Sequence, residues 1–230
     1  MMKFICIQIL LFVLILSFQA CKWQGQNHAE EHIETPDTNG GKQFETEARQ
    51  YESEDRVIWQ KPDLVIDQLG NVTGKVVADL GAGTGYFSRR IAYKGATVIA
   101  IDIDPQAIRW MEDQKARFPA ELQDRLIIRQ ADTDDPHLRE NEVDIVLLVN
   151  TYSYISDRIN YFSRLKNAIR PGGSIVIIDF KKKDTPFGPP VEERLEVPVV
   201  ENELREAGYD VVKVDEESLE YQYIIKARKK

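Results

Sequence analysis

The sequence predicts an α/β protein: a three-layer α/β/α sandwich around a mostly parallel seven-stranded sheet that ends in an antiparallel hairpin. Two observations lead to this fold class. Short runs of β-branched and aliphatic residues alternate with helix-like segments over residues 57–207, and such alternation favours a parallel sheet covered on both faces. The last two strand-like runs, 210–216 and 219–227, have no helical segment between them, which is typical of a hairpin.

The first half of the predicted domain begins with a helix over residues 57–69. The valine-rich run that follows and the β-branched run after it are expected to be strands, and Asp104 and Pro105 form the capped start of a helix. In order, the remaining elements predicted here are a strand over 75–80, a helix over 86–94, a strand over 97–101, a helix from 105 to about 118, and a strand over 125–130.

The second half contains the most apolar run of the domain, "VDIVLLVN", which is expected to form a buried strand over residues 143–150. Pro171 and the two glycines after it predict a turn that leads into the next strand. The other elements predicted here are a helix over 157–169, a strand over 174–180, and a mostly helical segment over 193–207 that Pro198 is expected to break.

Composition is consistent with one such domain plus extensions. The chain has 230 residues, of which 43% are hydrophobic and 30% are charged, and its formal net charge is −8. This length is sufficient for a single hydrophobic core. Proteins that bind nucleic acid through its phosphates are usually basic, so the acidic balance argues against a nucleic-acid partner and leaves a small ligand open.

The N-terminal segment 1–21 predicts an export signal. A lysine, Lys3, precedes an apolar stretch over residues 4–16, which is shorter than the roughly 20 residues that span a bilayer. The stretch runs into "SFQAC", and this end resembles the processing site of bacterial lipoproteins, with Cys21 as the acylated residue. The resemblance implies a membrane-associated protein, exported and lipid-anchored in a bacterial envelope. A plain cleaved signal and an uncleaved anchor are the alternatives.

Residues 22–50 are polar and acidic and predict a flexible linker, so the folded domain is expected over residues 51–230. Within the linker, "HAEEH" places two histidines four residues apart. Ala29 stands where the metalloprotease pattern requires glutamate, so no metal site is predicted. Both cysteines of the chain precede the domain, which excludes a cysteine nucleophile or a disulfide framework within it.

The expected binding site is the glycine-rich turn "DLGAGTGYF" after the first strand, because ligands of such sheets bind at the carboxyl ends of the strands. A phosphate-binding P-loop requires lysine after its last glycine, and here Gly85 is followed by Tyr86. Tyr86 also occupies the third glycine position of the dinucleotide fingerprint, which disfavours a nicotinamide-dependent oxidoreductase. Asp79 repels a pyrophosphate but suits a ligand that carries an ammonium or sulfonium cation.

Five segments, in the same order along the chain, resemble the class I S-adenosylmethionine-dependent methyltransferases. They are "DLGAGTG", "AIDIDP", "RQADTDDP", "DIVLLVNTYSYI" and "LKNAIRPGGSIVIIDF". The resemblance implies a Rossmann-like fold with S-adenosylmethionine as the cofactor. It also implies that Asp102 binds the two ribose hydroxyls, that Ile103 packs on the adenine, and that Asp132 reaches the adenine amino group. The full set of implied cofactor-binding residues is Asp79, Gly81, Ala82, Gly83, Thr84, Gly85, Asp102, Ile103, Asp132 and Asn150.

Methyl transfer from a sulfonium is an in-line displacement, so the protein mainly supplies proximity and alignment. A general base is required only when the acceptor must lose a proton, and the sequence identifies no catalytic residue. The predicted acceptor-site residues are Trp59, Tyr152, Tyr154 and Asp179, and the proline-rich loop 184–190 is expected to cover a site. The aromatic residues among them have core packing as an alternative role.

The sequence therefore predicts a methyltransferase that acts on a small-molecule or lipid-like acceptor. The alternative is a membrane-tethered, non-catalytic module of the same fold that binds a nucleoside-like ligand or a protein partner.

Overall fold

The structure is a computed structural model that describes residues 44–46, 48, 49 and 51–230. The predicted signal segment with Cys21, and most of the predicted linker, lie outside the described residues. Within the described part of the chain, none of the helices has the length and apolar character needed to cross a membrane.

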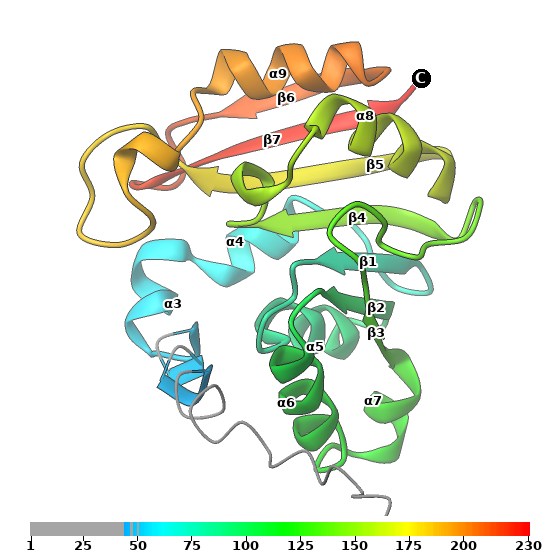
Figure 1. Cartoon of the computed structure of the whole chain (residues 1–230). Helices are drawn as coiled ribbons and strands as arrows, with labels where there is room; N and C mark the ends of the chain where they lie inside the picture. Colours follow the sequence, from blue (N-terminus) through cyan, green and yellow to red (C-terminus); the bar gives the residue numbers. More distant parts are fainter. Residues whose placement is uncertain (1–43, 47, 50) are drawn as a thin grey trace, which may run out of the picture. The chain divides into compact units, whose positions relative to one another are not determined.

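Seven strands form one sheet in the order β3-β2-β1-β4-β5-β7-β6 (Figure 1). Strands β1 to β5 are parallel to one another, whereas β7 is antiparallel to both β5 and β6. This topology confirms the predicted fold class. The strands are β1 (Val76–Leu80), β2 (Thr97–Asp102), β3 (Leu126–Gln130), β4 (Val143–Val149), β5 (Ile169–Phe180), β6 (Tyr209–Asp215) and β7 (Gln222–Lys229).

Helices cover both faces of the sheet and bury its alternating side chains. Ile177 of β5 belongs to a core cluster with α8 and α9, and its neighbour Ile178 belongs to a second cluster with α4, α5 and α7. Successive strand residues point to opposite faces, so the apolar run of β5 supplies both cores. The helices are α3 (Asp55–Gln60), α4 (Pro62–Asp67), α5 (Tyr86–Tyr93), α6 (Pro105–Lys115), α7 (Ala120–Arg125), α8 (Arg158–Leu165) and α9 (Val197–Glu206).

The helix predicted over residues 57–69 is two helices, α3 and α4. Lys61 separates them with a left-handed φ of 48°. A residue before proline is disfavoured in the right-handed helical region, and Pro62 then starts α4, where its missing N–H is not needed. The prediction of a single helix is therefore wrong, because Pro62 keeps Lys61 out of the right-handed helical region.

Two other prolines also act differently from the predictions. Pro198 lies in the first turn of α9 and breaks nothing, because that turn needs no proline N–H. Pro171 and the two glycines after it lie within β5 as an irregularity. The register of β5 against β4 moves from Val143↔Ile169 to Ile145↔Ser174 across this stretch.

Helix α7 (Ala120–Arg125) was not predicted from the sequence.

The described residues of the segment expected as a linker are helical. Phe44 packs edge-on against Trp110 with ring centroids 6.1 Å apart, and Ala48 is fully buried. The expectation of a flexible polar segment is therefore wrong for these last residues before the domain. The apolar side chains of Phe44 and Ala48 give them a surface to bury against α6.

Candidate functional site

The glycine loop joins β1 to α5 at the carboxyl edge of the sheet. Gly81 has a φ of 75°, and a Cβ there would lie 2.4 Å from Thr151 Oγ1, so β4's end packs closely on the loop. Gly83 has a φ of 56°, and the nearest atom to an added Cβ, a ring carbon of Tyr51, is 4.0 Å away. The loop therefore has a left-handed backbone that favours glycine, with open space beside Gly83.

Asp102, at the end of β2, bonds directly to the glycine loop. Its Oδ2 accepts the backbone N–H of Gly83 at 2.7 Å, and its Oδ1 accepts the N–H of Asp104 at 3.0 Å. Burial raises the pKa of Asp102, and these backbone hydrogen bonds oppose the increase. Asp104 caps α6 through the N–H of Gln106, as its position before Pro105 predicts. Asp102 therefore lies beside the glycine loop, and its predicted role toward ribose hydroxyls stays a prediction.

Ile103 and Asp132 lie at the same edge of the sheet. The side chain of Ile103 is 53% exposed, which leaves an apolar surface next to Asp102. The backbone N–H of Ala131 donates to the carbonyl oxygen of Asp102 at 2.9 Å, which brings the residue after it, Asp132, close to β2's end. The Asp132 carboxylate is exposed and lies 3.1 Å from His137 Nε2.

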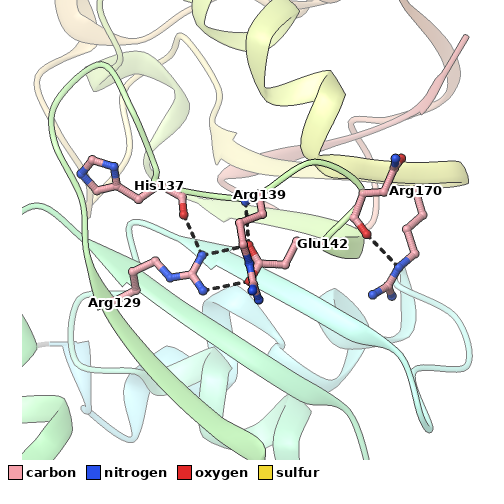
Figure 2. Close-up of polar contacts among 6 residues, drawn as sticks. Arg129, His137, Arg139, Glu142 and Arg170 are labelled. Atoms are coloured by element: carbon pink, nitrogen blue, oxygen red, sulfur yellow. Dashed lines mark hydrogen bonds and ion pairs between the residues drawn. The ribbon is translucent and has the colours of Figure 1, made fainter.

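Glu142 anchors the loop that carries Asp132. Figure 2 shows the guanidinium groups of Arg129 and Arg139 directed at its carboxylate. Arg129 also donates to the backbone oxygen of His137 at 2.9 Å. The hydrogen bond from Arg129, with further bonds from Arg139, lowers the pKa of Glu142 to about 2. These contacts fix the path of residues 130–142, which contain no helix.

Asp79 is buried beneath the glycine loop. Ser88 Oγ donates to its Oδ2 at 2.6 Å. Burial raises the pKa of Asp79 to about 6, against the opposing effects of the Ser88 hydrogen bond and the Arg56 cation. Nearby positive charge therefore does not fully offset the burial of this carboxylate, and an ammonium group bound nearby would stabilise its ionised form.

Asn150, just after β4, ends a chain of buried side-chain amides. It has a left-handed φ of 58°, and its Oδ1 accepts a hydrogen bond from Gln222 Nε2. Gln60 Nε2 donates to Gln222 Oε1 at 3.2 Å, and Arg56 Nε donates to Gln60 Oε1. Helix α3 is thereby connected to the ends of β4 and β7. No local sequence pattern predicts this series of hydrogen bonds, because 162 residues separate Gln60 from Gln222.

The segment before α3 lies against the glycine loop. Thr84 Oγ1 donates to Glu52 Oε1 at 2.7 Å, and Arg89 forms an ion pair with the same carboxylate. Although burial opposes it, these two partners lower the pKa of Glu52. Glu52 was not predicted as a site residue, yet it binds both the loop and α5.

The predicted acceptor residues Trp59 and Tyr154 lie at the rim of this edge. Trp59 stacks on Phe187 of the proline-rich loop, with centroids 5.4 Å apart, and it also contacts Phe180. Tyr154 is 62% exposed. The buried Arg194 holds the proline-rich loop by donating to the backbone oxygens of Lys181, Lys183, Phe187 and Pro189.

Tyr152, unlike Trp59 and Tyr154, does not lie at the rim of the carboxyl edge of the sheet. Its side chain is fully buried, its ring stacks on Phe162 at 4.8 Å, and its hydroxyl donates to Glu203 Oε2 at 2.9 Å. The prediction of a substrate contact for Tyr152 is therefore wrong, because the short 3₁₀ turn Tyr152–Tyr154 turns its first ring into the core and its last ring outward.

Asp179, the last predicted acceptor residue, is buried at the end of β5. Its Oδ1 accepts the N–H of Phe180 at 2.8 Å. Its Oδ2 is buried and has no hydrogen-bond partner among the residues that the structure describes. Burial raises its pKa to about 6.

Comparison with known proteins agrees with this architecture. Residues 78–177 match the family model described as "Methyltransferase domain". The chain is similar to demethylmenaquinone methyltransferase of Tropheryma whipplei, with 30% identity over 49% of this chain and 44% of that protein. It is also similar to ubiquinone biosynthesis O-methyltransferase of Pseudomonas syringae, with 27% identity over 52% of this chain and 48% of that protein.

Among solved structures, an S-adenosylmethionine-dependent methyltransferase from Aquifex aeolicus superposes with a TM-score of 0.73 at 22% identity, covering 82% of this chain and 97% of that one. This likeness shows the fold. The chain spans about half the length of the two curated relatives described above. The segment that matches the family model, residues 78–177, contains the glycine loop and strands β2, β3 and β4.

Proposed function

We propose that this chain, which carries a methyltransferase domain over residues 78–177, is an S-adenosylmethionine-dependent methyltransferase. The observation that carries the proposal is the glycine loop between two carboxylates, the buried Asp79 and the half-buried Asp102. Together with the family match, this arrangement supports a donor that is cationic at one end and carries ribose hydroxyls at the other.

The residues present suit that donor chemically. Asp79 supplies a buried carboxylate whose charge is only partly compensated, and this favours the α-ammonium of an amino acid. Asp102 offers carboxylate oxygens that accept hydrogen bonds from hydroxyl groups. Ile103 offers an exposed apolar side chain for the flat face of a base. Gly83 leaves room for close approach of a ligand to the backbone.

When bound, the donor supplies a methyl group on a positively charged sulfur, which is already an activated leaving group. The protein's task is to hold the acceptor in line with that methyl group and to keep water out. The segment that contains Glu52 is placed to cover the loop, because it bonds to Thr84 and to Arg89 of α5.

Calorimetry of the full-length chain tests the proposal. We expect S-adenosylmethionine and its demethylated product to bind, and NAD to show no measurable binding. Gly83→Val, which adds a β-branched side chain at a left-handed φ, should abolish donor binding. Wild-type protein that binds neither compound would contradict the proposal.

We propose a small-molecule or lipid-like acceptor. The names of the two relatives refer to demethylmenaquinone and to ubiquinone biosynthesis, and the two proteins match 49% and 52% of this chain. A screen with methyl-labelled donor against quinone, lipid and small-metabolite extracts tests this class. Label that appears only in protein or nucleic acid would contradict it.

A lipid anchor at Cys21 is a separate proposal that rests on the sequence alone, namely the apolar stretch 4–16 and the "SFQAC" end. Mass spectrometry of the mature N-terminus tests it. We expect a chain that begins at an acylated Cys21, and a chain that begins with an unmodified residue would contradict it.

A further inference from the structure

We infer that the space between the loop 131–142 and helix α8 is a binding site for a small aliphatic amine that carries two ammonium groups. The site is separate from the glycine loop, because none of the residues proposed to hold the donor lines it. The inference therefore goes beyond the proposed function and does not depend on it.

The first observation is a cavity of about 510 Å³ between this loop and α8. Strands β2 and β1 lie between β3 and β4 in the sheet, so the connection from β3 to β4 crosses two strands, and residues 131–142 do so without a helix. A helix usually covers the sheet in such a crossover. Here the space beside α8 stays open, and its volume is sufficient for a small molecule.

The second observation is a buried tyrosine whose hydroxyl has no hydrogen bond. Tyr161 of α8 lines the cavity and is 4% exposed. Its ring packs edge-on against Phe162, and its hydroxyl bonds to no residue that the structure describes. Burial raises the pKa of Tyr161, and the Asp135 carboxylate adds to the increase, which places the hydroxyl near the acidic loop. Buried polar groups are nearly always hydrogen-bonded, so this hydroxyl indicates that a ligand in the cavity supplies a partner.

The third observation is the charge of the lining. Three carboxylates and a single guanidinium, that of Arg164, line the cavity. Arg164 donates to the backbone oxygen of Asp134 at 2.9 Å and pairs with no carboxylate of the described residues. The side-chain carboxylates of Asp134 and Glu140 likewise have neither a hydrogen bond nor an ion pair within the described part of the chain. The cavity therefore carries uncompensated negative charge.

Basic side chains around the cavity do not neutralise these two carboxylates. Arg129 and Arg139 both bond to Glu142 (Figure 2), and His137 pairs with Asp132. A cationic ligand would supply the missing positive charge, whereas a carboxylate or phosphate ligand would be repelled.

The lining also indicates the shape of the cation. The Asp134 and Glu140 carboxylates can each receive one ammonium group, and the Tyr161 hydroxyl can accept a further hydrogen bond from an ammonium. Leu138 and Leu165 line the same cavity and offer apolar surface to a chain of methylene groups. A short aliphatic diamine combines these features, with an ammonium at each end of an apolar chain.

Calorimetry of the full-length chain with putrescine, a short diamine, tests the inference. Butane-1,4-diol and succinate serve as the neutral and anionic molecules of equal chain length. We expect putrescine to bind and the other two to show no measurable binding. Asp134→Asn combined with Glu140→Gln should weaken putrescine binding about tenfold, as expected for loss of two exposed ion pairs. Tyr161→Phe removes only the hydroxyl and should weaken it about 3- to 10-fold, the range for one hydrogen bond.

A matched double variant separates binding in the cavity from general attraction to an acidic chain. Glu112→Gln combined with Asp113→Asn removes the same two charges from α6, which does not line the cavity. This variant should keep its affinity within about twofold of wild type, because distant exposed charges are screened by salt. Both double variants change exposed side chains, so they should fold as wild type does.

Three results would overturn the inference: wild-type protein that does not bind putrescine or binds the diol equally well, an equal loss of affinity in both double variants, or unchanged affinity in Tyr161→Phe. The titration contains no S-adenosylmethionine. Its outcome is therefore independent of whether the chain binds that donor, and failure of this inference leaves the proposed function standing.

Discussion

The backbone N–H of Gly83 lies 2.7 Å from Asp102 Oδ2, so a single carboxylate ties the loop after β1 to the end of β2. A carboxylate has lone pairs enough for several donors, so this bond can persist beside hydrogen bonds from a ligand. The bond also holds the loop in the conformation in which Gly83 faces open space. Asp102 therefore has two roles in the proposed function: it shapes the loop and it binds the donor.

Asp102→Ala should weaken S-adenosylmethionine binding by about 10- to 100-fold, as expected for loss of hydrogen bonds to a charged group worth about 1.5–3 kcal/mol. Calorimetry measures the change. Asp104→Asn is the matched control, because it changes a neighbouring carboxylate and retains an oxygen to cap α6. Equal loss of affinity in both variants would contradict a specific role for Asp102.

Asp79→Asn should make the folded protein more stable at pH 8 while weakening donor binding. The pKa of Asp79 is about 6 in the folded state, above its ordinary value of 3.8. Folding therefore opposes its ionisation, by about 3 kcal/mol at pH 8. This cost is absent below about pH 4 and develops as the pH rises through about 6. Urea denaturation at pH 8 and pH 4 should show the gain only at pH 8.

The donor affinity of wild-type protein should correspondingly rise between pH 5 and pH 7, because a cationic group binds the ionised form of Asp79. In Asp79→Asn the affinity should be lower and nearly constant over this range. Wild-type affinity that does not change with pH would show that Asp79 does not receive the cation.

Gly81→Ala should destabilise the domain by about 1–3 kcal/mol more than Gly70→Ala, the usual cost of inserting an extra methyl into a packed site. Both glycines have a φ of 75°, so the backbone strain is matched. A Cβ at Gly70 meets nothing within 4 Å, whereas one at Gly81 reaches Thr151. Thermal unfolding of the two variants measures the difference. Similar melting temperatures would mean that Thr151 moves aside.

Glu142→Gln should destabilise the domain at neutral pH by about 1–2 kcal/mol, a magnitude typical of hydrogen bonds to a charged group at a partly exposed site. The pKa of Glu142 is about 2, below its ordinary value of 4.5. Its stabilising contribution is therefore complete above pH 4.5 and declines as the pH falls through about 2. Denaturation profiles of the two proteins should converge in acid, and a constant difference would contradict the charge-based explanation.

The strands and the glycine loop could be predicted because their signals are local. A strand appears as a short apolar run, and Gly81 and Gly83 appear as residues that tolerate a left-handed backbone. The contrast between Tyr152 and Tyr154 could not be predicted. The two rings are two residues apart in the same motif, and only the 3₁₀ turn decides that one is buried and the other exposed.

The connection from Arg56 through Gln60 and Gln222 to Asn150 was also beyond sequence reasoning. Glutamine is common on protein surfaces, and nothing in its neighbours along the chain marks Gln60 or Gln222 as fully buried. Their burial depends on a pairing between α3 and the first residue of β7. Long-range contacts of this kind become visible only when the topology is known.

Because β7 lies between β5 and β6 in the sheet but follows both in the chain, β6 has no strand to pair with until residues 222–229 have been made. During synthesis on a ribosome, the growing domain must keep the apolar edge of β5 from aggregating until that final strand arrives. Gln222, the residue that bonds to Asn150, is the first of this strand. The sheet and the carboxyl edge that carries the glycine loop are therefore completed together, late in the folding of the chain.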